Sequence, residues 1–202
     1  MLTSSGLETP RLRKLFSSLL ETKVPEARII VIHTASKPEH LVYVDKVGRE
    51  LSKCGILLPN ITYVDINSRN SSPSLSDYDA IYVCGGNTYH ILDRIRKVSL
   101  DKSIPNFVKT RGIYVGVSAG SIIACKSIEI AGWGSEGDPN DIHLKDLGGL
   151  GFTNIAVFPH YQSKLKKEVD EFRQKSKNPV ESLRDKEAIV IKGNKITKIS
   201  RT

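Results

Sequence analysis

Residues 114–124 read Tyr-Val-Gly-Val-Ser-Ala-Gly-Ser-Ile-Ile-Ala and contain the pattern Gly-x-Ser-x-Gly at positions 116–120. An apolar run precedes the serine, and small residues with helical spacing follow it, so the pattern predicts a strand, a tight turn and a helix. A serine in such a turn needs neighbours with minimal side chains, because its hydroxyl has to stand above the sheet. The N–H of Ala119 would point into the same space from a helix N-terminus and can stabilise an oxyanion there. Ser118 is therefore the candidate nucleophile; the alternative is a chance match in a Gly/Ser-rich loop.

Outward from this turn, apolar strands alternate with helical patterns along the chain. The predicted strands are 27–33, 61–66, 79–84, 112–117 and 154–158, after a very short first strand at 2–6. The predicted helices are 7–20, 39–54, 88–98, 104–110 and 164–175. Residues 187–192 and 195–200 predict a terminal β-hairpin around a Gly-Asn turn. We therefore expect one α/β domain over residues 1–202, with a mostly parallel sheet covered by helices on both faces.

The composition narrows the class of protein. The chain has 202 residues, 39% of them hydrophobic, and a net charge of +8. The basic residues are scattered and no nucleic-acid motif accompanies them, so we expect no nucleic-acid partner, and the positive field would equally favour small anions. No apolar run approaches the ~18 residues of a membrane span and no signal-peptide pattern is present, which predicts no membrane association. The isolated Cys54, Cys84 and Cys125 argue against disulfides and a CxxC metal site and favour a cytoplasmic location.

A serine nucleophile needs a base and a group that orients the base. Chemistry in parallel sheets gathers beyond the carboxyl ends of the strands, where Ser118 and His160 are both predicted to lie. His160 follows a buried strand directly, behind a proline, and is the preferred base. The other histidines, at positions 33, 40, 90 and 143, remain alternatives, and a histidine at a strand end can also be purely structural.

The acid and the second oxyanion donor are less well determined. Asp185, just before the terminal hairpin, is the candidate acid; Glu187, Asp138 and Asp141 are the alternatives. Gly86, in the turn Gly85-Gly86-Asn87-Thr88, can supply a backbone N–H to the oxyanion, although the turn can also be a plain strand-to-helix connection capped by position 87. It lacks the lysine of a phosphate-binding P-loop.

Three motifs in this order resemble one known family. They are Cys84-Gly-Gly-Asn-Thr-Tyr89, Gly116-Val-Ser-Ala-Gly-Ser121 and Phe158-Pro-His-Tyr161. Together they resemble the aspartyl dipeptidase (peptidase E) family, from residue 3 to the terminal hairpin. The resemblance implies a flavodoxin-like fold related to class I glutamine amidotransferases, where a cysteine occupies the elbow, and more distantly to cyanophycinase. It also implies a Ser118–His160 pair with the acid before the last hairpin, where this chain has Asp185 and the family usually a glutamate. An aspartate in the loop after the elbow helix has also been given a role in the family, which keeps Asp138 open.

The chain departs from this family in one specificity segment. The family has an arginine after its Pro-His motif that grips the substrate's side-chain carboxylate, whereas residues 161–167 here read Tyr-Gln-Ser-Lys-Leu-Lys-Lys. Arg173 or a lysine is the candidate replacement, and Asn87 is the second candidate substrate-binding residue.

These observations predict a serine peptidase that hydrolyses short peptides, including those with an N-terminal aspartate. We expect a monomer or homodimer without a metal ion or organic cofactor. One alternative is a catalytically silent binding protein of the same fold. The other is an α/β-hydrolase-type esterase, whose chains are longer and usually place the acid before the histidine.

Overall fold

The computed structural model describes residues 1–34, 38–70, 72–110 and 112–200. Within these residues, one sheet contains seven strands in the order β3 (Ile61–Asp65), β2 (Ile29–His33), β4 (Ala80–Val83), β5 (Ile113–Val117), β1 (Leu2–Thr3), β8 (Ala188–Lys192) and β9 (Lys195–Ile199). The strands from β3 to β1 are parallel, and β8 pairs antiparallel with both β1 and β9. The predicted α/β fold with a mostly parallel sheet and a terminal hairpin is therefore confirmed.

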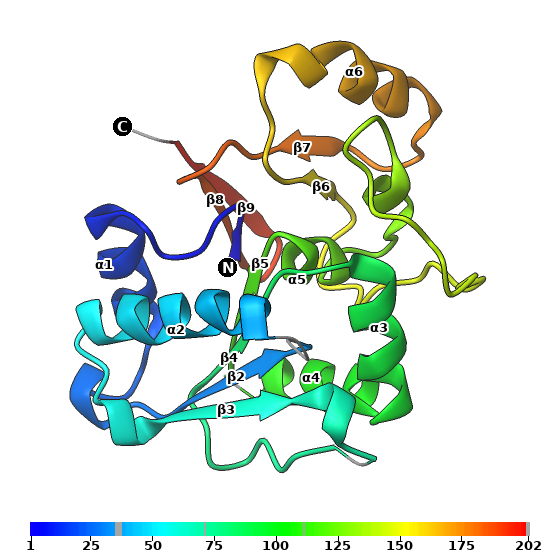
Figure 1. The fold of residues 1–202 in the computed structure, drawn as a ribbon. Coiled ribbons are helices and arrows are strands. Elements are labelled where there is room, and N and C mark those ends of the chain that lie inside the picture. Colours follow the sequence, from blue (N-terminus) through cyan, green and yellow to red (C-terminus); the bar gives the residue numbers. More distant parts are fainter. Residues whose placement is uncertain (35–37, 71, 111, 201–202) are drawn as a thin grey trace.

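Helices cover both faces of this sheet (Figure 1). The α-helices are α1 (Pro10–Leu19), α2 (Pro38–Lys53), α3 (Thr88–Lys97), α4 (Leu100–Lys109), α5 (Ala119–Ile123) and α6 (Lys166–Lys175). Short 3₁₀ turns span Val24–Glu26, Leu58–Asn60, Ile66–Ser68, Glu129–Gly132 and Ser163–Leu165. No helix in the described ranges is both long and apolar enough to cross a membrane.

The core divides into two layers because successive side chains of a strand point to opposite faces. Ile30 and Ile32 of β2 pack with α3, α4 and α5, whereas Ile29 and Val31 pack with α1 and α2. All residues of β2 and β4 are buried, as expected for central strands covered on both sides. These rigid strands position the residues that follow their carboxyl ends.

One predicted strand lies elsewhere. Residues 154–158 were expected in the main sheet, but β6 (Ala156–Phe158) pairs in parallel with β7 (Val180–Ser182) in a separate two-stranded sheet. β7 is not among the strands predicted from the sequence, because its three residues are too few for a periodic pattern. With α6, these strands form the part drawn at the top of Figure 1. His160 therefore reaches the main sheet from a separate layer.

Candidate active site

Ser118 lies in a strained turn between β5 and α5. Its backbone has φ 51° and ψ −112°, a conformation that L-residues rarely adopt. The flanking glycines are required by close packing: a Cβ at Gly120 would overlap the carbonyl oxygen of Val83, and one at Gly116 would lie 2.5 Å from the carbonyl oxygen of Gly120. The N–H of Ser118 donates to the carbonyl of Thr3, 3.0 Å away. The strand–turn–helix arrangement expected of a nucleophile elbow is present.

Ser118, His160 and Asp185 form one chain of hydrogen bonds. Oγ of Ser118 is 2.9 Å from Nε2 of His160, and Nδ1 of His160 is 2.8 Å from Oδ1 of Asp185. With a proton on Nδ1, the ring donates to the carboxylate and Nε2 accepts the serine hydroxyl. The side chains of His160 and Asp185 are 47% and 57% exposed, so this half of the site lies open to solvent.

Asp185 is held in its ionised form. Partial burial raises its pKa, but hydrogen bonds from Ser4 and His160, together with the charges of His160 and Lys46, outweigh burial and lower the pKa below its usual value. A carboxylate beside Nδ1 favours the tautomer that leaves Nε2 free to accept a proton from Ser118. This is the electrostatic arrangement that a serine nucleophile requires.

Ser4, at the carboxyl end of β1, also belongs to this network. Its hydroxyl donates to Oδ1 of Asp185 at 2.9 Å and accepts from the backbone N–H of His160 at 2.8 Å. In the sequence, this position was predicted only as part of a short first strand. A small polar residue at the carboxyl end of a central strand was the available signal.

The other candidate acids face elsewhere. Asp138 accepts both the N–H and the hydroxyl of Thr88, at 2.8 and 2.6 Å, and so caps the N-terminus of α3. Asp141 lies 2.6 Å from Nε2 of His90, and Glu187 accepts the backbone N–H of residue 184. Among the described residues, Asp185 is the carboxylate within hydrogen-bonding distance of the predicted base.

The alternative histidines are placed differently from His160. His33 is buried at the end of β2, and burial lowers its pKa. His90 lies on α3 beside Asp141, and His143 is exposed in the loop that follows α5. His40 lies outside the residues whose side chains the structure describes. His160 is the histidine within hydrogen-bonding distance of Ser118.

Both predicted oxyanion donors belong to segments beside Ser118. Ala119 is the first residue of α5, and the first N–H groups of a helix have no partner within it. A Cβ at Gly85 would lie 3.2 Å from Cβ of Ser118, so the Gly85–Gly86 turn passes directly beside the serine. Gly86 has φ 145°, which glycine adopts without strain.

The side chain of Asn87 makes hydrogen bonds within the protein at both its oxygen and its nitrogen. Its Oδ1 accepts the N–H of His90 at 3.1 Å as the N-cap of α3, and its Nδ2 donates to the carbonyl of Pro139 at 2.8 Å. The side chain still lines the cavity described next. Its local role is to tie the loop after α5 to the start of α3.

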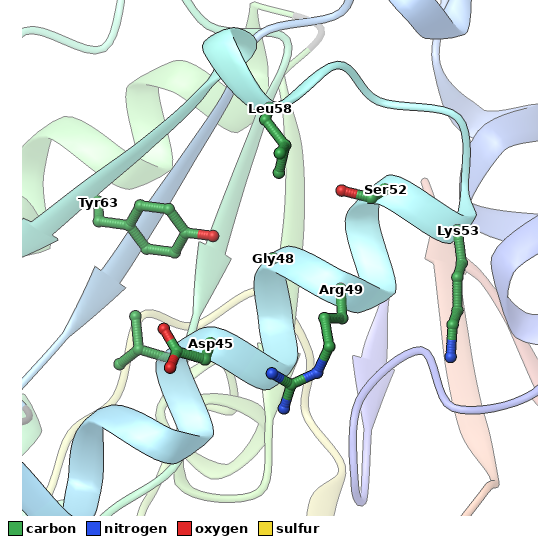
Figure 2. Close-up of a pocket in the computed structure, with 8 residues that line it drawn as sticks. Asp45, Gly48, Arg49, Ser52, Lys53, Leu58 and Tyr63 are labelled. Atoms are coloured by element: carbon green, nitrogen blue, oxygen red, sulfur yellow. The ribbon is translucent and has the colours of Figure 1, made fainter.

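A cavity of about 720 Å³ opens beside the elbow. Ser118, His160 and Gly86 line it, and α2 contributes Lys46 and Glu50 to the lining. A second hollow of about 660 Å³ lies between α2 and β3, near Asp45, Gly48, Arg49 and Tyr63 (Figure 2). The second hollow contains none of the predicted site residues, so the first is the candidate active site.

The structure does not bring Arg173 to this cavity. On α6, its guanidinium donates to Asp170 at 2.8 Å and to Oγ of Ser182 at 3.3 Å. Among the described residues that line the cavity, Lys46 is the one lysine, and there is no arginine. Its Nζ contacts the carboxylate of Glu8 and lies 3.9 Å from Glu50. Burial works against the charged lysine, but these carboxylates prevail and raise its pKa. The cavity's fixed positive charge is thus already paired.

Cys84 also lines the cavity, next to Gly85. Burial raises the pKa of its thiol to about 12, so it stays protonated at neutral pH. The thiolate is the nucleophilic form of cysteine. Cys84 is therefore a poor competitor of Ser118 for the role of nucleophile.

A flavodoxin-like sheet with a serine at the elbow, hydrogen-bonded to a histidine, is the arrangement expected of a serine hydrolase. Comparison with known proteins identifies the family within this class. The model of the family described as "Peptidase family S51" matches residues 1–199, so the chain belongs to this family. It is accordingly a serine peptidase that acts on peptides, and neither the silent binding protein nor the α/β-hydrolase-type esterase is favoured.

Several relatives agree with this assignment. The uncharacterized peptidase Lmo0363 of Listeria monocytogenes is 26% identical over 199 residues, which cover 96% of this chain and 95% of the relative. Peptidase E of Salmonella arizonae is 30% identical over 128 residues, 61% of this chain and 50% of that protein. The crystal structure of a peptidase from an acI-B1 actinobacterium has a TM-score of 0.72 at 18% identity, covering 99% of this chain and 86% of that one. The predicted family is confirmed, while the roles of individual site residues remain predictions.

Proposed function

We propose that this peptidase cleaves short peptides with Ser118 as nucleophile, His160 as general base and acid, and Asp185 as the group that orients the histidine. The observation that carries the proposal is the continuous hydrogen-bonded chain from Ser118 through His160 to Asp185, with the serine at a strained turn that opens into a cavity. Each part answers a requirement of peptide hydrolysis by a serine.

The proposed reaction has two halves. Oγ of Ser118 attacks the peptide carbonyl while Nε2 of His160 takes its proton, and the N–H groups of Gly86 and Ala119 stabilise the oxyanion. The C–N bond then breaks as His160 gives the proton to the leaving amine, which leaves an ester on Ser118. A water molecule that His160 deprotonates attacks this ester, and the proton returns to Ser118 as the acid product leaves.

The residues around the cavity favour short peptides as substrates, without a strong requirement for an N-terminal aspartate. Arg173 is bonded to Asp170 away from the cavity, and Lys46 is paired with Glu8. A paired lysine is a poorer partner for a substrate carboxylate than a free arginine, which binds it with two parallel hydrogen bonds. We therefore propose dipeptidase-like activity with only a moderate preference for aspartate, in a cytoplasmic monomer or homodimer.

Labelling with a fluorophosphonate probe tests the nucleophile. The wild-type protein should be labelled at Ser118 and Ser118→Ala should not, provided that both melt at the same temperature. Iodoacetamide at neutral pH should leave turnover of a dipeptide panel unchanged, because the thiol of Cys84 is protonated. Equal labelling of both proteins, or rapid inactivation by iodoacetamide, would remove Ser118 from the mechanism.

A further inference from the structure

We propose that Ser4 is a positioning residue of this peptidase, whose single hydroxyl holds His160 and Asp185 in the arrangement that activates Ser118. This inference rests on the proposed function, since it concerns the same site.

The contacts of Ser4 join the two residues at one atom. Oγ of Ser4 donates to Oδ1 of Asp185 at 2.9 Å and accepts the backbone N–H of His160 at 2.8 Å. The same Oδ1 accepts from Nδ1 of His160 at 2.8 Å. Because a hydroxyl has one proton and two lone pairs, both bonds can exist together. The backbone of His160 and the carboxylate that orients its ring are thus hydrogen-bonded to the same hydroxyl.

The His160–Asp185 pair needs such an anchor because it is exposed. An exposed ion pair gains little energy and keeps much of its side-chain freedom. His160 also has a positive φ of 54°, which surrounding contacts have to maintain. Ser4 is fully buried, with a relative exposure of 0%, so its own rotamer is confined by its neighbours. It therefore provides a buried partner to two residues whose side chains are exposed.

Ser4 also connects this pair to the strand that bears the nucleophile. The preceding residue, Thr3, pairs with Val117 in β5, and its carbonyl accepts the N–H of Ser118 at 3.0 Å. Its side-chain hydroxyl donates to the carbonyl of Gly116 at 3.0 Å. The chain from Thr3 to Ser4 therefore links the elbow to the base and the acid, although these come from three distant parts of the sequence.

Loss of the Ser4 hydroxyl should affect the chemical step more than binding. Without it, Asp185 and His160 sample orientations in which Nε2 no longer faces Oγ of Ser118. A misplacement of about 1 Å in a reacting group can reduce a rate by about 100-fold. If Ser4 merely satisfied a buried N–H, its removal would change the melting temperature and leave the rate constant of labelling unchanged.

The experiment measures fluorophosphonate labelling of Ser118, separated into the maximal rate constant and the half-saturating concentration. In Ser4→Ala we expect the maximal rate to fall by between about 10- and 100-fold, with the half-saturating concentration unchanged. Ser5→Ala is the matched control. In the part of the chain that the structure describes, the Ser5 hydroxyl accepts the N–H of Lys186 in the turn beside Asp185 and makes no hydrogen bond to His160 or Asp185. The fold decrease of the maximal labelling rate in Ser5→Ala should be at least fivefold smaller than in Ser4→Ala.

A double-mutant cycle distinguishes positioning from general stability. If Ser4 acts through Asp185, then Ser4→Ala should cost less than about threefold in an Asp185→Ala background. Equal losses in both backgrounds, or a Ser4→Ala rate within threefold of the wild type, would overturn the inference. Should Ser4→Ala melt markedly earlier, Ser4→Cys keeps most of the volume and should show the same loss. Absence of labelling in the wild type would instead refute the proposed function, so the two failures can be told apart.

Discussion

Oδ1 of Asp185 lies 2.8 Å from Nδ1 of His160, on the side of the imidazole ring that faces away from Ser118. The two residues are 25 positions apart and follow different strands, β6 and β7. These two short strands pair in register from Ala156 with Val180 to Phe158 with Ser182, and the N–H of Tyr161 donates to the carbonyl of Leu183 just beyond them. The small second sheet thus brings the proposed base and acid together.

The first prediction concerns the base. In His160→Ala, turnover of a good dipeptide should fall by about 1,000-fold or more, because a serine hydroxyl is a weak nucleophile without a base. His143→Ala, which removes an exposed loop histidine, should stay within about threefold of the wild type. If His90→Ala abolished turnover while His160→Ala kept it within tenfold, His160 would be the wrong histidine.

The second prediction separates the two aspartates. Asp185→Asn should lower kcat by about 1,000-fold with little change in melting temperature, because asparagine does not favour the required tautomer. Asp138→Asn should mainly lower stability, by about 1 kcal/mol, since Asp138 caps α3 through Thr88. Steady-state kinetics and thermal melts of both variants check this. The reverse pattern would transfer the acid role to Asp138.

The third prediction concerns substrate preference. Because Arg173 is bonded to Asp170, Asp-Leu should exceed Leu-Leu by about tenfold in kcat/KM, equivalent to about 1.4 kcal/mol. Arg173→Ala should change this ratio by less than threefold. A preference of about 1,000-fold that disappears in Arg173→Ala would show instead that the arginine reaches the substrate.

The fourth prediction tests the packing of the elbow. Gly120→Ala should destabilise the protein by about 1–3 kcal/mol, because its Cβ would overlap the carbonyl oxygen of Val83 in the neighbouring strand. Gly48→Ala is the matched control in α2. Its Cβ would overlap the hydroxyl of Tyr63, which points toward this helix in Figure 2 and belongs to an exposed side chain that can move. The helix gains up to about 1 kcal/mol from alanine. Urea unfolding of both variants measures the contrast, and equal destabilisation would contradict it.

The fifth prediction is a pH dependence of stability that arises from Glu50. Burial raises the pKa of this carboxyl, although the N–H of Leu7, the charge of Lys46 and the hydroxyl of Tyr82 lower it in part. Below about pH 4.5, Glu50 is protonated in both folded and unfolded chains. As the pH rises above this value, the unfolded chain ionises first, so the contribution of Glu50 to stability decreases until the folded pKa is passed.

Glu50→Gln removes this titration but keeps an oxygen that can accept from Leu7 and Tyr82. The stability of the variant relative to the wild type should therefore increase between about pH 4.5 and pH 7, as measured by urea unfolding at both values. A difference that stays constant over this range would show that Glu50 has an ordinary pKa in the folded protein.

Local patterns were sufficient for much of the fold and for two members of the site. The glycines at positions 116 and 120 predicted the elbow because the packing of a strand against the following helix leaves room only for hydrogen there. The apolar runs predicted the buried parallel strands, and the position of His160 after one such run predicted a histidine at a strand end. Each of these inferences depends on residues that are close in sequence, so the chain itself contains the physical constraint.

Other features depend on which distant segments meet, and only the tertiary structure determined them. The sequence favoured Asp185 as the acid but left Asp138, Asp141 and Glu187 open. In the structure, strand pairing places Asp185 beside His160, and hydrogen bonds to Thr88 engage Asp138. Ser4 had no local pattern because its two partners lie more than 150 positions away. The same long-range packing left Arg173 on α6, bonded to Asp170. Strand order and register place these side chains, and nearest-neighbour sequence carries too little information about either.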